Sequence, residues 1–385
     1  MSATKRYDVV VIGAGVFGAW TAWHLVRRGK RVLLVDAYGP ANARASSAGE
    51  SRIVRMGYGA DEIYTQWARK SLGQWREFFE KVGRRELFVE TGVLWLARKD
   101  DGRVRETAAT LKRCGVRFQQ MDLRTLEQWY PQIGLDEITW GLLEPDSGVL
   151  MARRGVAAVV EDAVRAGAEY RVADIATPRG AGRVAAVATR AGERIEAGEF
   201  IFACGAWLGK SFPDVLGGRI FPSRQEVFFF GVPAGDQRFA PGALPTFLFQ
   251  AEESYGMPDL EARGLKIAID RHGERVDPDT QSRIASADAI EEIRRYLARR
   301  FPALRDAPIL ETRVCQYENT SSGDFLIDQH PEMDNVWFVG GGSGHGFKHG
   351  PALGEYVTGR ILDGAAGEER FSLASKDLVQ RRAVY

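Results

Sequence analysis

The chain has 385 residues, enough for about two domains, and its 45% hydrophobic and 27% charged residues are ordinary for a soluble globular protein. Its 52 basic and 51 acidic residues leave a net charge of +1, which argues against a nucleic-acid partner. Three widely spaced cysteines without a C-x-x-C pair indicate neither a zinc site nor a disulfide framework. No window reaches the roughly 18 apolar residues of a membrane span. The first predicted strand also begins too early to leave room for a signal peptide, so we expect a cytoplasmic protein without a membrane partner.

The N-terminal stretch has the pattern of a dinucleotide-binding βαβ unit. Its parts are an apolar strand at 9–12, Gly13, Gly15 and Gly18 at G-x-G-x-x-G spacing, a helix at 19–25 and a strand at 31–35 that ends in Asp36. The glycines allow a tight turn, the approach of a pyrophosphate and close helix packing, and Asp36 can accept hydrogen bonds from a ribose diol. The complete unit favours dinucleotide binding over a glycine-rich turn without a ligand. The motif alone does not separate FAD from NAD.

A long loop of small residues at 37–51 follows, and its backbone N–H groups and hydroxyls suit a segment that lies along an extended cofactor. The loop ends at Arg52-Ile-Val-Arg55, which brings two cations toward the cofactor, unless both are ordinary surface arginines. The next expected elements are a buried amphipathic helix at 61–82, two antiparallel strands within 87–96, helices at 104–113 and 126–131, and a strand and turn at 141–150.

The second half of the chain contains both helix-like and strand-like patterns. Its expected elements are a helix at 153–167, strands at 168–172, 183–189 and 193–195, a buried parallel strand from 199 that closes on a small-residue turn, an antiparallel sheet within 219–313, a helix at 288–300, a strand from 335 and a helix that starts at Pro351. Because a second glycine-rich turn precedes that last helix, we expect both ends of the chain to embrace the cofactor.

Five motifs carry a resemblance to a known family. They are Val11–Gly18, Gly49–Arg55, Glu144–Leu150, Cys315–Tyr317 and Gly344–Lys348. In order and spacing the chain resembles the monomeric sarcosine oxidase and N-methyltryptophan oxidase family, flavoprotein amine oxidases of the D-amino-acid-oxidase-like superfamily, over essentially its whole length. The resemblance implies FAD, covalently linked through Cys315, which would otherwise be read as a small buried hydrophobe.

The resemblance also implies a mixed α/β and α+β fold, in which a Rossmann-like FAD-binding domain of the glutathione-reductase type joins a mostly antiparallel substrate domain. We expect residues 1–82, 149–218 and 314–385 in the FAD-binding domain, and 83–148 and 219–313 in the substrate domain. The residues expected to contact the cofactor are Gly13, Gly15, Val16, Phe17, Gly18, Asp36, Ala37, Arg44, Ser46, Ser47, Arg52, Val172, Cys204, Gly205, Trp207, Cys315, Gly344, His345, Gly346, Phe347 and Lys348.

Catalytic roles follow from the same resemblance. Arg52 and Lys348 match the family's pair that binds the substrate carboxylate, for which a guanidinium fork and a point charge are well suited. Lys266 matches the lysine whose charge stabilises superoxide as O₂ is reduced, although a solvated strand lysine is the plainer interpretation. Tyr255 and Tyr317 match aromatic positions around the substrate, unless they are core residues. The chain has only five histidines, and we expect no metal.

Two positions depart from the family. Asp270 and Ala48 each stand where the family has a histidine. By resemblance, relatives that oxidise fructosyl amino acids or a cyclic imino acid carry an acid near the position of Asp270, where a carboxylate favours a cationic amine or the hydroxyls of a sugar. Asp270 could also be only a turn residue. A secondary amine that bears a carboxylate is therefore a safer expectation than sarcosine itself.

The leading hypothesis is an oxidase that converts the C–N bond of N-methyl, N-substituted or cyclic amino acids to an imine, which water hydrolyses, with hydrogen peroxide as the second product. The alternatives are a fructosyl-amino-acid oxidase, a dehydrogenase of the same fold with another electron acceptor, a tRNA-modifying flavoprotein and a non-enzymatic flavin-binding module. The expected partners are the amino-acid substrate and O₂, and we expect a monomer or a small homo-oligomer.

Overall fold

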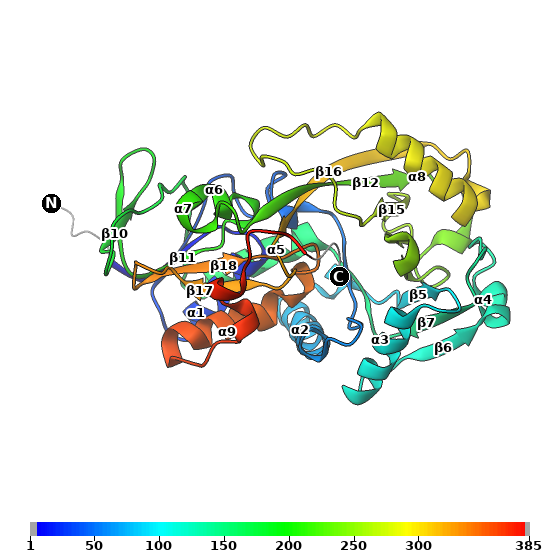
Figure 1. The fold of residues 1–385 in the computed structure, drawn as a ribbon, viewed down its shortest axis with the longest axis horizontal. Coiled ribbons are helices and arrows are strands. Elements are labelled where there is room, and N and C mark those ends of the chain that lie inside the picture. Colours follow the sequence, from blue (N-terminus) through cyan, green and yellow to red (C-terminus); the bar gives the residue numbers. More distant parts are fainter. Residues whose placement is uncertain (1–5, 382–385) are drawn as a thin grey trace.

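Three β-sheets organise the computed structural model, which describes residues 6–381 (Figure 1). The first sheet has the strand order β17-β18-β11-β1-β2-β9, and β10 pairs with the outer part of β11. Its strands are β1 (Arg6–Ile12), β2 (Val32–Asp36), β9 (Glu169–Val172), β10 (Ala186–Ala188), β11 (Arg194–Phe202), β17 (Leu326–Gln329) and β18 (Val336–Gly340). The ladders between β9, β2, β1, β11 and β18 are all parallel. The apolar runs of β1, β2 and β18 are typical of such a sheet. The turns that follow β1, β11 and β18 therefore meet at one edge of the sheet.

Helices cover both faces of this sheet. Figure 1 shows α1, α2 and α9 on one face and α6 and α7 on the other. Their bounds are α1 (Val16–Arg27), α2 (Glu62–Lys81), α5 (Ala152–Arg165), α6 (Leu208–Ser211), α7 (Pro213–Leu216) and α9 (Gly350–Asp363). Trp20 of α1 meets Trp75 and Phe78 of α2 edge to face, at centroid distances of 4.9 and 5.2 Å. The predicted helix at 61–82 is thus confirmed as a core element.

The second sheet has eight strands in the order β16-β12-β15-β14-β13-β5-β7-β6. Its strands are β5 (Val93–Ala97), β6 (Gln119–Asp122), β7 (Trp140–Glu144), β12 (Phe221–Phe230), β13 (Thr246–Phe249), β14 (Ser254–Met257), β15 (Leu265–Ile269) and β16 (Ile309–Asn319). All neighbours are antiparallel except β13 and β5. Helices α3 (Gly102–Arg113), α4 (Leu123–Trp129) and α8 (Ala287–Arg300) accompany this sheet.

A small third sheet, β3-β8-β4, joins two of the sequence motifs. Its strands are β3 (Arg52–Val54), β4 (Phe88–Val89) and β8 (Gly148–Leu150). Two predictions about strands are corrected. The strands within 87–96 do not pair with each other, because β4 joins β8 whereas β5 joins β7 and β13. The segments at 193–195 and from 199 form the single strand β11, whose outer part alternates in burial and whose inner part is fully buried.

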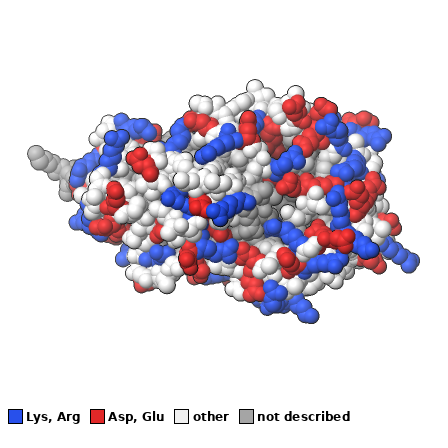
Figure 2. Space-filling model, viewed as in Figure 1, with Lys and Arg blue, Asp and Glu red and all other residues white. Residues whose placement is uncertain are grey.

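The long ladder between β12 and β16 carries the second sheet back toward the first, with register pairs from Phe221–Asn319 to Phe230–Ile309 (Figure 1). The predicted domain boundary between residues 313 and 314 falls within the continuous strand β16. The division of the chain into two domains stays a prediction. Its outer limits, residues 1 and 385, lie outside the described residues. Lys and Arg side chains are interspersed with Asp and Glu over the face shown in Figure 2. Within residues 6–381, no helix has both the length and the apolar character needed to cross a membrane.

Candidate active site

The turn between β1 and α1 has the conformation that its glycines predict. Gly13 has φ +108°, and a Cβ atom there would lie 2.3 Å from the Ala203 carbonyl oxygen. A Cβ at Gly18 would lie 1.9 Å from the Gly13 carbonyl oxygen. Both positions therefore require glycine if α1 is to start directly above the ends of β1 and β11.

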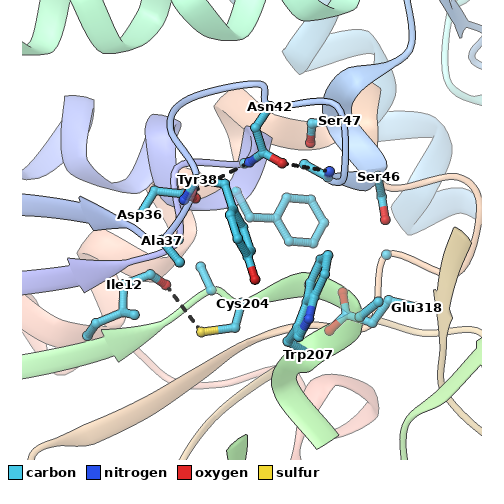
Figure 3. Close-up of a pocket in the computed structure, with 18 of the residues that line it drawn as sticks. Ile12, Asp36, Ala37, Tyr38, Asn42, Ser46, Ser47, Cys204, Trp207 and Glu318 are labelled. Carbon is cyan, nitrogen blue, oxygen red and sulfur yellow. Dashed lines mark hydrogen bonds between the residues drawn. The ribbon is translucent and has the colours of Figure 1, made fainter. Parts of the chain in front are cut away.

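A cavity of about 380 Å³ opens at the edge where the three turns meet (Figure 3). The predicted residues that line it are Gly13, Gly15, Val16, Phe17, Asp36, Ala37, Ser46, Ser47, Arg52, Cys204, Gly205, Trp207, Cys315, Tyr317, Gly344, Gly346 and Phe347. They come from the turns after β1, β11 and β18, from the end of β2, from the 37–51 loop and from β16. The sequence prediction that both ends of the chain meet at one site therefore agrees with the geometry.

The remaining predicted cofactor residues do not line the cavity but lie behind or beside its wall. Gly18 is a packing residue. The Arg44 guanidinium lies 4.7 Å from the ring centroid of Tyr38 on the rim. Val172 is exposed at the end of β9, and the next residue, Ala173, lines the cavity in its place. His345 is turned into the protein, where its ring stacks on Phe325 at 5.1 Å.

The polar groups at this edge suit a dinucleotide. The helix α1 starts at the cavity, and its N–H groups and dipole favour an anion there. Asp36 is fixed by backbone N–H groups of Ala14 at 2.8 Å and of Tyr38 at 2.8 Å. Burial nevertheless raises the pKa of the Asp36 carboxyl. In Figure 3, Tyr38 and Trp207 lie next to each other on the cavity wall, and their ring centroids are 6.3 Å apart.

Cys315 lines the cavity, in contact with Arg52 and close to Lys266. Its Sγ atom is 3.5 Å from Nη2 of Arg52. The Arg52 guanidinium also donates to the carbonyl oxygens of Ser46 and Ser51, at 2.9 and 3.1 Å. Lys266 does not line the cavity, but its Nζ donates to the carbonyl oxygen of Ser51 at 2.8 Å, and burial followed by the charge of Arg52 holds its pKa well below the usual lysine value.

Asp270, Tyr317 and Tyr255 lie together next to Cys315. The Tyr317 hydroxyl donates to Oδ1 of Asp270 at 2.6 Å. Burial raises the pKa of the Asp270 carboxyl, and the charges of Arg55 and Lys348 act in the opposite direction. A Cβ at Gly344 would lie 2.7 Å from the Tyr317 ring, so glycine at that position lets the C-terminal turn approach the tyrosine.

Lys348 is grouped with Arg55, and the predicted pairing of Lys348 with Arg52 at a substrate carboxylate stays a prediction. Nζ of Lys348 donates to the hydroxyl of Tyr58 at 2.7 Å and to the carbonyl oxygen of His345 at 2.9 Å. Burial lowers the pKa of Lys348, and Arg55 is the next contributor. Arg52, the first residue of β3, is held at Ser46, Ser51 and Cys315.

Glu144 explains why Arg55 takes this position. Its buried carboxylate accepts hydrogen bonds from the backbone N–H groups of Met56 at 2.6 Å and Gly57 at 3.1 Å, and from Trp95 Nε1 at 2.8 Å. The bend after β3 is thereby fixed, and the Arg55 guanidinium stacks over Tyr58, 4.3 Å from its centroid. The Glu144–Leu150 motif thus supports the site from behind.

Sequence reasoning noticed Arg55 but gave it no role, and it missed Tyr38, Asn42 and Glu318, which line the cavity. Tyr38 and Asn42 follow Asp36 closely enough to be placed with it, and an acid directly after Tyr317 on the same strand could have indicated Glu318. Among residues 6–381, no cluster of three or more His, Cys, Asp or Glu side chains could hold a metal ion.

These features define a flavin-binding enzyme, and the chain belongs to the family described as FAD dependent oxidoreductase, which matches residues 8–360. The glycine turn, the helix N-terminus and the long cavity fit FAD.

The expected resemblance is confirmed. The chain is 30% identical to monomeric sarcosine oxidase from Bacillus sp. (strain B-0618), over 94% of this chain and 93% of the relative. It is 27% identical to N-methyl-L-tryptophan oxidase from Escherichia coli O139:H28, over 92% and 94%.

Two solved structures show the same fold. L-Proline dehydrogenase from P. horikoshii superposes with a TM-score of 0.82 at 21% identity, covering 96% of this chain and 97% of that one. Fructosamine oxidase from Aspergillus fumigatus superposes with a TM-score of 0.81 at 20% identity, covering 97% and 90%. The predicted fold class, an FAD-binding domain joined to a second and mostly antiparallel domain, is confirmed.

Proposed function

We propose that the protein oxidises the C–N bond of a secondary amino acid to an imine, which water then hydrolyses, while O₂ becomes hydrogen peroxide. Bound FAD supplies the electron-transfer chemistry. The observation that carries the proposal is the grouping of Arg55, Lys348 and Asp270 beside the cavity wall that holds Cys315. Two cations and one acid are the complement of a carboxylate and a neighbouring amine.

Each charged group has a distinct role in this proposal. Arg55, oriented by stacking on Tyr58 and Trp95, binds the substrate carboxylate together with Lys348. Asp270 receives the amine or its polar substituent, with Tyr255 and Tyr317 as walls. Arg52 and Lys266 lie on the Cys315 side, where their charge serves the flavin and the reduction of O₂.

We further infer a covalent link between Cys315 and the flavin, since Sγ of Cys315 lies in the cavity wall, 3.5 Å from Nη2 of Arg52. The variant Cys315→Ser is expected to lose all flavin from the protein band after acid denaturation, whereas the wild type keeps its flavin. Cys204→Ser is the matched control, since Cys204 lines the same cavity at a different turn. Flavin fluorescence in the denatured protein band measures the result, and free flavin from the wild type would contradict the inference.

Asp270 is expected to set the preference for the amine substituent. Asp270→Asn should lower kcat/KM by about 10- to 100-fold, the cost of a hydrogen bond to a charged group. Because burial raises its pKa, Asp270 loses its charge at a higher pH than an ordinary aspartate, so affinity for a cationic amine should fall as the pH drops. The variant Asp270→Asn should lose this pH dependence. The control Tyr317→Phe should keep it, because it retains the Asp270 carboxyl group. An unchanged pH profile of kcat/KM in Asp270→Asn would make Asp270 only a turn residue.

The test of the function is anaerobic mixing of the yellow protein with sarcosine, other N-methyl amino acids, L-proline, L-pipecolate and fructosyl-glycine, followed by the admission of air. Bleaching by one compound with rapid recolouring and peroxide formation supports the oxidase and identifies its substrate. Bleaching without recolouring supports a dehydrogenase instead. The absence of bleaching by every compound would contradict the proposed substrate class.

Two alternatives remain proposals within the same fold. The structural likeness to fructosamine oxidase, together with Asp270, favours a fructosyl-amino-acid substrate as the second candidate. The likeness to L-proline dehydrogenase keeps a non-oxygen acceptor as a third. In each case we infer a cytoplasmic enzyme, monomeric or a small homo-oligomer, whose partners are an amino-acid substrate and an electron acceptor.

A further inference from the structure

One acid on the cavity wall has no role in the proposed reaction. Glu318 lies near the end of β16, and its side chain lines the cavity although only 6% of the residue is exposed. Figure 3 shows its carboxyl group beside Trp207, with Cys204 on the neighbouring turn. Glu318 therefore faces the same cavity as Cys315, where the flavin ring is proposed to bind, and as the turns after β1 and β11.

The surroundings of this carboxyl group disfavour a negative charge. Oε1 is buried without a hydrogen-bond partner among residues 6–381, and a Cβ at Gly340 would lie 2.3 Å from it. Burial raises the pKa of Glu318 to about 8, and the backbone N–H groups of Gly341 and Gly342 offset only part of that effect. At neutral pH the group carries its proton and can donate a hydrogen bond.

We propose that Glu318 donates a hydrogen bond to a hydroxyl or phosphate oxygen in the central part of the FAD molecule, and thereby positions the cofactor. A buried carboxyl oxygen without a partner, here Oε1, is costly unless a ligand completes its hydrogen bonding, and the cavity that Glu318 lines is where that ligand binds. A carboxylate at the same place would repel a diphosphate, whereas a protonated carboxyl group attracts it. This inference does not depend on the amino-acid substrate.

The other titratable groups around Glu318 do not change their charge in the same pH range. The Cys204 thiol has its pKa raised by burial and then by the charges of Asp36 and Glu318. Lys210, on the next helix, is held by Asp277 and Asp279 at 2.9 Å or less, and its pKa is raised. The turn after β18 contributes only glycines at 340–342. A change in FAD affinity near pH 8 that the variant Glu318→Gln abolishes would therefore report on Glu318.

The test measures the FAD dissociation constant between about pH 6 and pH 10 by flavin fluorescence. All proteins carry Cys315→Ser, so that FAD exchanges whether or not the wild type links it. With Glu318 present, affinity should fall as the pH rises through about 8. Glu318→Gln keeps a donor without a titrating proton, so it should bind as tightly as Glu318 does at pH 7 and lose the pH dependence. Glu318→Ala should bind about tenfold more weakly at pH 7, as expected for one lost hydrogen bond.

Asp279→Asn serves as the control, because Asp279 is an acid of the same cavity whose pKa is lowered, and it should leave the pH dependence as it was. The melting temperature of the corresponding holoproteins with Cys315 intact gives a second readout over the same pH range. Equal affinities of the Ala and Glu proteins at every pH would overturn the proposal. A Gln variant as weak as the Ala variant would also overturn it, since the group would then act as an anion.

Discussion

Replacing Lys266 with methionine should slow the reaction of the reduced protein with O₂ by about 100- to 1,000-fold, the usual effect of removing a preorganised charge from a developing anion. The rate of anaerobic reduction by substrate should stay close to that of the wild type. Lys266 is only 3% exposed, and its Nζ is held by the carbonyl and hydroxyl oxygens of Ser51 at 2.8 and 3.2 Å. A cation fixed in this way needs little reorganisation when superoxide forms.

The pH dependence of the oxygen reaction follows from the same surroundings. Burial, and after it the charge of Arg52, hold the pKa of Lys266 well below that of an ordinary lysine. The charge on Lys266 is therefore present at low pH and lost as the pH rises through this lowered value, and the reoxidation rate should fall in the same direction. Lys266→Met should show no such fall.

Stopped-flow mixing of the substrate-reduced protein with buffers of known O₂ content measures the reoxidation rate, and anaerobic mixing with substrate measures the reduction rate. Lys266→Arg is the matched control, because it keeps a cation on β15 at nearly the same place. If methionine slows both half-reactions equally, Lys266 has a general structural role and the proposed role in O₂ reduction is wrong.

The parts of the fold that the sequence predicts well are those in which local pattern and long-range packing agree. The β1–α1–β2 unit is predicted completely, because Gly13 and Gly18 are required by contacts that any such unit makes. The strands within 87–96 are predicted as strands but are given the wrong partners. Their partners β7, β8 and β13 lie about 50 to 155 residues further along the chain, and no local pattern reports such pairing.

At the candidate site, too, local sequence does not determine which single residues line the cavity. Val172 was chosen where Ala173 lines the cavity, because the end of a strand is uncertain by a residue or two from sequence. His345 is on the predicted turn, but its ring points into the core, which only the packing of Phe325 decides. Glu318 was missed because its significance depends on burial, and burial of one acid on a strand cannot be read from the strand's own residues.

The proposal that Arg55, and not Arg52, binds the substrate carboxylate leads to the prediction with the largest effect on substrate binding. Arg55→Met should lower kcat/KM by about 100- to 1,000-fold, which corresponds to about 3–4 kcal/mol for the loss of one partner of a buried charge pair. The loss should appear as weaker binding of the substrate in anaerobic titrations of flavin absorbance. Flavin content should stay normal, because Arg55 lies outside the cavity wall and contacts Tyr58 and Trp95.

Arg52→Met should produce the opposite pattern, with reduced flavin content or a lost covalent link and a smaller effect on substrate affinity in the molecules that retain flavin. The reason is that Arg52 contacts Sγ of Cys315 and lines the cavity, whereas Arg55 is the arginine whose charge acts on both Lys348 and Asp270. Arg55→Lys separates charge from shape, since lysine keeps the cation but cannot form the planar fork that grips a carboxylate. If Arg52→Met weakens substrate binding more than Arg55→Met does, Arg52 binds the substrate carboxylate. The bend that Glu144 fixes after β3 would then not serve to place Arg55 at the substrate.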